Sequence, residues 1–160
     1  MHAQNYQYPT EAHLLYPMVK HQLAAMTEGI TDTISNLSNA AALLNLALKD
    51  INWVGFYLRK GDCLVLGPFQ GKPACVEIAW GKGVCGTAAE TGLVQRVEDV
   101  HAFPGHIACD CNSRSEIVLP LRKEGRVVAV LDIDSPVLGR FTPEDEEGLG
   151  MLVPVLEELL

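Results

Sequence analysis

The sequence predicts a single α+β domain, in which an antiparallel sheet carries helices on one face and a long loop on the other. Three observations predict this class. Apolar side chains recur at helical spacing in the first 50 residues, two strand-turn-strand segments follow, and a capped helix closes the chain. Helices segregated to one face of an antiparallel sheet are typical of α+β proteins. The 160 residues contain no repeat or linker, so one domain over residues 1–160 is expected.

Helices are expected at both ends of the chain. The first spans about residues 10–26, and the second is capped by Thr31 or Asp32. The apolar stripe of the second helix has steps of three and four residues and consists of Ile34, Leu37, Ala41, Leu44 and Leu48. The last helix spans residues 142–160 with Thr142 as its N-cap and acidic residues in its first turn.

Two hairpins form the predicted sheet. The segment INWVGFYLRKGDCLVLGPFQ turns at Lys60–Asp62, and SEIVLPLRKEGRVVAVLDIDS turns at Glu124–Gly125. A short helix, VCGTAAETG, and a short strand, LVQRV, lie between the hairpins. The irregular stretch of about 98–114 is expected to cover the second face of the sheet, since such long loops are usually lids or binding loops.

Charge and composition exclude several classes of protein. Twenty acidic and 12 basic residues give a formal net charge of −8, which disfavours binding to nucleic acid or to an anionic membrane. No apolar run is long enough to span a bilayer, and the N-terminus lacks the features of a secretory signal. The sequence therefore predicts a cytoplasmic protein. Its five cysteines then point to catalysis, redox sensing, metal binding or core packing rather than to a disulfide framework.

Two of the cysteines, Cys85 and Cys109, lie in settings that suit reactive thiols. Cys85 is expected in the first turn of the short helix, where the helix dipole lowers a thiol pKa. Cys109 follows His106 by three residues, and an imidazole nearby also favours a thiolate. Cys75 is expected to begin a strand. The alternative for each is a small buried hydrophobe, which is the favoured interpretation for Cys63.

A zinc site is the next alternative for these cysteines. His106, Cys109 and Cys111 lie close together in the sequence. Structural zinc sites usually contain cysteine pairs separated by two to four residues, whereas this chain has only Cys-x-Cys. The prediction is that the protein binds no metal.

Three carboxylates are expected to meet at one end of the second hairpin. Asp132 and Asp134 share a strand face, and the run VVAVL before them predicts burial on both sides. A turn at Glu124–Gly125 places Glu116 opposite residue 133 or 134. Such a cluster raises at least one carboxyl pKa and suits cation binding or proton donation. The alternative is that these acids mark strand ends in water.

Two aromatic residues share a face of the first predicted strand. Trp53 and Tyr57 are four residues apart, so their side chains point the same way. Core packing is the ordinary interpretation for aromatic residues in a strand. A pocket wall that holds a thioether or methyl group is the other.

Five blocks of sequence occur in an order that resembles a known family: GPFQGKPAC, GKGVCGTA, VEDVHAFPGHIACD, SEIVLPL, and VLDIDS followed by RFTPEDEEGL. They are similar to the free methionine-(R)-sulfoxide reductases, which use a GAF domain, and the similarity covers about residues 12–158. It implies one GAF domain over the chain. It also implies that Cys109 attacks the sulfoxide sulfur, that Cys85 is the main resolving cysteine, and that Cys75 can pair with Cys109 in an oxidised resting form.

The resemblance also implies the rest of the chemistry. Glu116, Asp132 and Asp134 would line the substrate pocket, with Trp53 and Tyr57 as its aromatic wall. The substrate would be free methionine sulfoxide, and electrons would come from NADPH through thioredoxin without a bound cofactor. Cys111 and Cys63 are extra to the family pattern, and Cys111 leaves the partner of Cys109 open.

Two other functions are compatible with the fold. A GAF sensor of a small ligand such as a cyclic nucleotide would need none of these cysteines, and a thiol redox sensor would not need the carboxylates. The terminal helices allow a homodimer surface, although packing on the sheet explains their apolar faces equally well.

Overall fold

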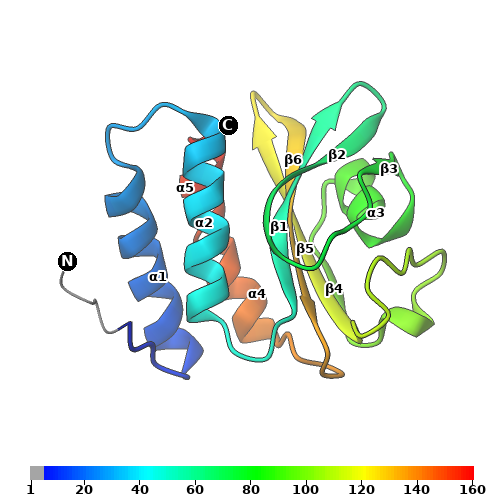
Figure 1. Cartoon of the computed structure of the whole chain (residues 1–160), viewed down its shortest axis with the longest axis horizontal. Coiled ribbons are helices and arrows are strands. Elements are labelled where there is room, and N and C mark those ends of the chain that lie inside the picture. The colour runs from blue at the N-terminus through cyan, green and yellow to red at the C-terminus, as the bar shows by residue number, and fades with distance from the viewer. Residues whose placement is uncertain (1–5) are drawn as a thin grey trace.

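The computed structural model describes residues 6–160, which form one six-stranded sheet with helices on both sides (Figure 1). The strands are β1 (Trp53–Lys60), β2 (Cys63–Gly71), β3 (Glu77–Ala79), β4 (Gln95–Val97), β5 (Ser115–Lys123) and β6 (Arg126–Ser135). The helices are α1 (Ala12–Thr27), α2 (Thr33–Ala47), α3 (Gly83–Thr91), α4 (Pro143–Gly150) and α5 (Val153–Glu157). All strand neighbours are antiparallel, in the order β3-β2-β1-β6-β5-β4. The predicted α+β class is confirmed.

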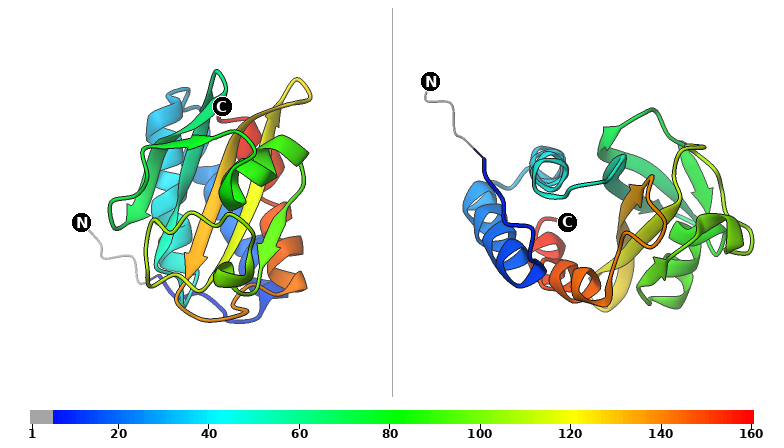
Figure 2. Two further views of the ribbon diagram at one scale, coloured as in Figure 1. Left: turned by 90° about the vertical axis from the view of Figure 1, so that its right-hand side faces the viewer. Right: turned by 90° about the horizontal axis from the view of Figure 1, so that it is seen from below.

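The terminal helices cover one face of the sheet in two layers. Helices α2 and α5 pack on the strands, and α1 lies outside them against α2, α4 and α5 (Figure 2). The core between these helices and the sheet contains side chains with no exposure, among them Leu37, Phe56, Ile117, Leu131 and Ile133. The predicted placement of the helices is confirmed.

The opposite face of the sheet carries α3 together with the irregular loop, as the left view of Figure 2 shows. A second cluster of buried residues lies here and includes Trp53, Tyr57, Cys85 and Val118. Strand β6 is therefore buried on both sides, as its apolar sequence predicts. The loop is confirmed as a cover for this face, and α3 shares that role.

The second hairpin turns where the sequence predicts. Glu124 and Gly125 have φ of 52° and 77°, the paired positive values of a two-residue turn that matches strand twist. A bulge follows between Leu121 and Arg122, and beyond it Glu116 pairs with Asp134. The turn thus fixes which carboxylates face one another.

The helix caps agree with the sequence at two points. The Asp32 carboxylate accepts a hydrogen bond from the Ser35 backbone N–H at 2.7 Å, and Thr142 forms a reciprocal capping box with Asp145.

The prediction that Ile34 belongs to the buried stripe of the second helix is wrong, because its side chain is 57% exposed in the first turn of α2. The buried face of this helix begins at Asn36 and Leu37 instead.

The predicted helix over residues 142–160 is in fact two helices. Pro154 has no N–H to donate to the Gly150 carbonyl, so α4 ends at Gly150 and α5 begins at Val153. The bend lets α5 reach β5 while α4 stays against α1.

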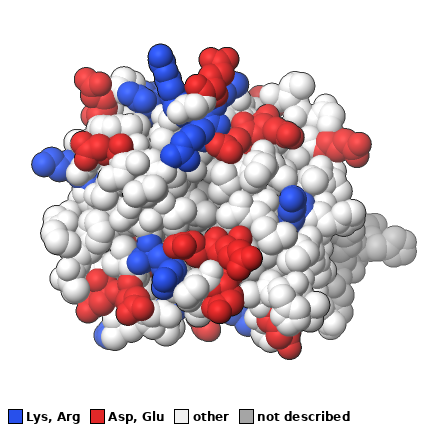
Figure 3. Space-filling view, turned by 180° about the vertical axis from the view of Figure 1, so that it is seen from behind, with Lys and Arg blue, Asp and Glu red and all other residues white. Residues whose placement is uncertain are grey.

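The surface reflects the excess of acidic residues. From behind, groups of Asp and Glu side chains alternate with Lys and Arg side chains (Figure 3). Within residues 6–160, no helix has the length and apolar character that crossing a bilayer requires.

Candidate active site

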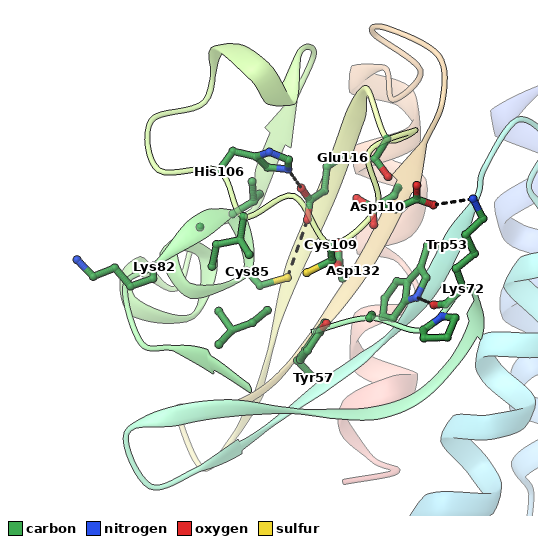
Figure 4. Close-up of a pocket in the computed structure, with 18 residues that line it drawn as sticks. Trp53, Tyr57, Lys72, Lys82, Cys85, His106, Cys109, Asp110, Glu116 and Asp132 are labelled. Atoms are coloured by element: carbon green, nitrogen blue, oxygen red, sulfur yellow. Dashed lines mark hydrogen bonds and ion pairs between the residues drawn. The ribbon is translucent and has the colours of Figure 1, made fainter. Parts of the chain in front are cut away.

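A pocket opens on the face of the sheet that carries α3 and the irregular loop (Figure 4). The space between its lining residues, open solvent included, is about 550 Å³. Seven of the eight residues singled out from the sequence line it: Trp53, Tyr57, Cys85, Cys109, Glu116, Asp132 and Asp134. The eighth, Cys75, is bonded to one of them. The structure thus brings the whole predicted set together.

Strand register positions the carboxylates. Glu116 on β5 pairs with Asp134 on β6, and Asp134 pairs in turn with Trp53 on β1. Asp132 lies two residues from Asp134 and therefore shares its face of the sheet. Glu116 and Asp132 are both buried, so the alternative of strand ends in water does not hold for them.

Burial sets the protonation of this cluster. It raises the pKa of Glu116 well above its usual range, and the charges of Asp132 and Asp134 raise it further. Burial also raises the pKa of Asp134 well above its ordinary value, followed by the charges of Asp132 and Asp110. The pKa of Asp132 is raised by burial as well. The cluster can therefore hold a proton at a pH where ordinary carboxyls are ionised.

One oxygen of this cluster is buried and has no hydrogen-bond partner among the described residues. It is Oδ1 of Asp132. A buried acceptor of this kind is costly unless a ligand donates to it. This oxygen is therefore suited to accept from a cationic or N–H group bound in the pocket.

Cys85 lies in the first turn of α3 as predicted, but the inferred thiolate is wrong. The residue is 3% exposed, and its Sγ donates a weak hydrogen bond to Glu116 Oε1 at 4.0 Å. Burial raises the pKa of the Cys85 thiol well above its ordinary value, and the charges of Asp132 and Glu116 raise it further. Desolvation and three nearby carboxyls outweigh the helix dipole, so Cys85 is a protonated thiol.

Cys109 is joined to Cys75 by a disulfide with a Cα–Cα distance of 5.7 Å. Cys75 lies in the coil before β3 and does not begin the strand as predicted, since β3 starts at Glu77. Cys109 is exposed and Cys75 is half-buried. The bond closes a loop of 34 residues and connects the two segments that edge the pocket.

The aromatic wall is held by hydrogen bonds to the segment that carries Cys75. Trp53 Nε1 donates to the Lys72 carbonyl at 3.2 Å, and the Tyr57 hydroxyl donates to the Cys75 carbonyl at 2.9 Å. The two rings stack with centroids 5.9 Å apart. Trp53 and Tyr57 therefore belong to the buried core and also form a wall of the pocket, so the two interpretations of these residues both hold.

His106 and Ile107 bring the irregular loop onto the pocket. His106 Nε2 lies 3.9 Å from Glu116 Oε2, and burial lowers the pKa of His106, as does the charge of His101. Ile107 packs against Gly83, where a Cβ would lie 3.0 Å from its side chain. Gly83 also has φ of +63°, so glycine suits this position at the start of α3 for two reasons.

A group of hydrogen-bonded polar side chains beside Cys109, centred on Asn52 and Asp110 and called the latch below, was not predicted from the sequence. Asn52 Nδ2 donates to Asp110 Oδ2 at 3.1 Å and to Ser113 Oγ at 3.0 Å, and Lys72 Nζ lies 4.0 Å from the same Asp110 oxygen. The backbone N–H of Asn112 also donates to Asp110 and lowers its pKa. Asn52 and Asp110 are 58 residues apart, so no local pattern could have predicted the contact.

The remaining thiols lie elsewhere. Cys111 is exposed, and Cys63 is half-buried with its Sγ 3.2 Å from the Lys60 carbonyl, so it is less buried than predicted. Because Cys109 is bonded to Cys75, the set of His106, Cys109 and Cys111 is not free to bind zinc in this state. Within the described residues, ligand atoms of Cys85, Glu116 and Asp132 lie within 4.8 Å of one another and could hold a metal.

The chain is similar to known proteins over most of its length. Residues 22–157 match the GAF domain family. The chain is 57% identical to the free methionine-R-sulfoxide reductase of Escherichia coli, over 91% of this chain and 88% of that protein. It is 44% identical to the enzyme of that name from Saccharomyces cerevisiae, over 88% and 84%. The fold superposes with a TM-score of 0.92 on the free methionine-R-sulfoxide reductase of Neisseria meningitidis in complex with its substrate, at 45% identity over 99% and 95% of the two chains. These relationships show that the chain belongs to the GAF-domain family and, within it, to the free methionine-R-sulfoxide reductases.

Proposed function

We propose that this protein reduces free L-methionine (R)-sulfoxide to methionine, with Cys109 as the attacking thiolate. The observation that carries the proposal is the placement of Cys109, which edges a pocket with a buried carboxyl cluster on one side and a stacked aromatic wall on the other. The close relatives bearing this activity in their names support the same substrate.

The pocket groups match the parts of this substrate. The unpartnered Oδ1 of Asp132 would accept from the ammonium group, with Asp134 beside it. Trp53 and Tyr57 would pack on the methyl-thio end, since thioethers pack well against aromatic rings. Glu116, whose raised pKa keeps it protonated, would donate a proton to the sulfoxide oxygen.

The chemistry then needs only thiols and one proton. The Cys109 thiolate attacks the sulfur of the substrate, Glu116 protonates the oxygen, and methionine leaves with Cys109 as a sulfenic acid. A second thiol displaces that hydroxyl as water and forms a disulfide. Two electrons from a dithiol then restore both thiols.

We assign Cys75 as the thiol that resolves the sulfenic acid. The Cys75–Cys109 bond supports it, whereas Cys85 is buried and protonated. Quenched-flow measurement of methionine formed per enzyme in the absence of reductant is the test. Cys109→Ser should form none, and Cys75→Ser should form one equivalent and accumulate a dimedone-reactive sulfenic acid. If Cys85→Ser accumulates the sulfenic acid instead, Cys85 is the resolving thiol.

The electron source is proposed to be thioredoxin, supplied by NADPH through its reductase in the cytoplasm, without a metal or organic cofactor. In this assignment Cys85 and Glu116 hold protons rather than a metal, because burial favours their neutral forms. Treatment with EDTA, followed by assay in metal-free buffer, should therefore leave the rate unchanged. Loss of activity that zinc or another divalent cation restores would contradict this part of the proposal.

The decisive assay follows NADPH consumption with thioredoxin, its reductase and racemic free methionine sulfoxide. Consumption should stop when half of the substrate is used, and a peptide containing methionine sulfoxide should give none. The reason proposed for the second result is that His106, Ile107 and Cys109 of the irregular loop line the pocket, so a peptide backbone would have to displace that loop. Equal rates on the peptide would contradict the assignment to the free amino acid.

The terminal helices also allow a homodimer, which sedimentation velocity would detect. Every group in the proposed chemistry comes from one chain. The specific activity, that is the rate per protein molecule, should therefore not change with protein concentration.

A further inference from the structure

Exposed apolar residues flank the Cys75–Cys109 bond on both sides. We call Pro73, Val76, Ile107 and Ala108 the disulfide rim. Each lies within two residues of a bonded cysteine, and Val76 and Ile107 are 67% and 38% exposed. Single exposed apolar residues are common on proteins, but a set gathered around an accessible disulfide suggests a contact surface.

The reduction of this bond requires close approach by another molecule. A thiolate must reach one sulfur along the S–S axis, so a protein dithiol has to press its surface against the residues around the bond. Cys109 is the more exposed partner, whereas Cys85 is 3% exposed and beyond the reach of a protein thiol. The accessible chemistry is thereby confined to the Cys75–Cys109 bond.

We propose that the disulfide rim is the docking surface for a thioredoxin-type protein dithiol, with Val76 as its main apolar contact. This inference rests on the proposed function. Lys72 and Lys82 line the pocket near the rim, but Asp110 pairs with Lys72 and the exposed Glu77 follows Val76, so the disulfide and its apolar neighbours, rather than a net charge, would recognise the dithiol (Figure 4).

The exchange occurs in two balanced steps. The redoxin thiolate forms a bond to Cys109 Sγ while the Cys75–Cys109 bond breaks, and the Cys75 sulfur takes the electron pair and then a proton. The second redoxin thiol attacks the mixed disulfide and releases Cys109. Two thiols remain on this chain, and the redoxin leaves as its disulfide.

The test compares two reductants on the same variants. Val76 does not line the pocket, so Val76→Asp and Val76→Ser should keep the wild-type rate with dithiothreitol, which is too small to need the rim. With thioredoxin, the KM for thioredoxin should rise about tenfold in Val76→Asp and about threefold in Val76→Ser, because burying a valine side chain contributes to binding. The serine variant separates the loss of apolar contact from the added charge.

Ile34→Asp is the matched control. Ile34 is also β-branched and is 57% exposed, but it lies in α2, on the other side of the sheet. Ile34→Asp should therefore change neither the KM for thioredoxin nor the rate with dithiothreitol. An unchanged KM for thioredoxin in both Val76 variants would overturn the docking surface. If the wild type is active with dithiothreitol but not with thioredoxin, the docking proposal fails while the reductase function stands. Inactivity with both reductants would reject the proposed function itself.

Discussion

Glu116 is the residue at which stability and chemistry oppose each other most clearly. It is buried beside Asp132 and Asp134, and it also touches Cys85 and His106. Ionising it costs free energy, because burial and neighbouring acids both disfavour the charge. The same cost keeps the proton on Glu116 at neutral pH, which a general acid requires.

Replacing Glu116 by Gln should therefore stabilise the protein at high pH while it reduces activity. The folded state keeps the Glu116 proton to a higher pH than the unfolded state does. Wild-type stability thus falls as pH rises from about the ordinary value of 4.5 through the raised folded pKa. Glu116→Gln removes that contribution, so its Tm should exceed that of the wild type at pH 8 more than at pH 5.

Scanning calorimetry at the two pH values measures this difference, and kcat/KM should fall about 10²- to 10⁴-fold in the same variant. Glu28→Gln, at an exposed site, is the control and should change neither quantity. A Glu116→Gln variant with wild-type kcat/KM would remove Glu116 as the acid.

Cys111 should be dispensable for turnover, although it lies two residues from Cys109. Cys109 is bonded to Cys75, and Cys111 is exposed at a turn. Cys111→Ser should keep the thioredoxin-coupled rate within about twofold of the wild type, whereas Cys75→Ser should reduce it strongly. A loss of rate in Cys111→Ser comparable to that in Cys75→Ser would mean that Cys111 takes part in the exchange.

Among the elements, the contact between α1 and α4 depends on a glycine. A Cβ at Gly148 would overlap the ring of Tyr16. Tyr16 is 1% exposed, and its hydroxyl donates to Asp145 Oδ1 at 2.6 Å, so the ring cannot move without breaking that bond. Asp145 also caps α4 and pairs with Arg140 at 3.0 Å. The side chains at this contact are thus mutually fixed.

Gly148→Ala should destabilise the protein by about 1–3 kcal/mol through overpacking. For a domain of this size, each kcal/mol lowers Tm by about 2–4 °C. Gly150→Ala is the matched control in the same helix, because a Cβ there meets nothing within 4 Å. That variant should be neutral or stabilised by up to about 1 kcal/mol. Equal Tm values for the two variants would contradict the role of the Tyr16 contact.

At the scale of the whole molecule, the disulfide couples the irregular loop to the β2–β3 connection. Reduction should therefore increase amide hydrogen exchange in residues 104–112 while strands β5 and β6 stay protected. Chain entropy limits the accompanying loss of unfolding free energy to about 3–4 kcal/mol for a loop of 34 residues.

Hydrogen-exchange mass spectrometry of the oxidised protein, the reduced protein and Cys75→Ser measures this change. The variant controls for effects of the reductant, and it should resemble the reduced protein. Exchange in residues 104–112 as slow as in the core strands after reduction would contradict the coupling. It would also mean that the latch of Asn52 and Asp110 holds the loop without the disulfide.

Features that depend on neighbours along the chain could be predicted from the sequence. Helix spacing, the Thr142 cap and the turn at Glu124–Gly125 follow from local propensity, and strand parity then brings Glu116 toward Asp132 and Asp134. The single domain over residues 1–160 and the roles of the site residues remain predictions.

Features that depend on burial and on distant contacts became visible only in the folded chain. The sequence places Cys85 at a helix N-terminus, which favours a thiolate, yet packing against three carboxyls makes it a neutral thiol. The latch between Asn52 and Asp110 joins residues that are 58 positions apart. The physical reason is the same in both cases: desolvation and long-range contacts are properties of the packed chain, and no local pattern encodes them.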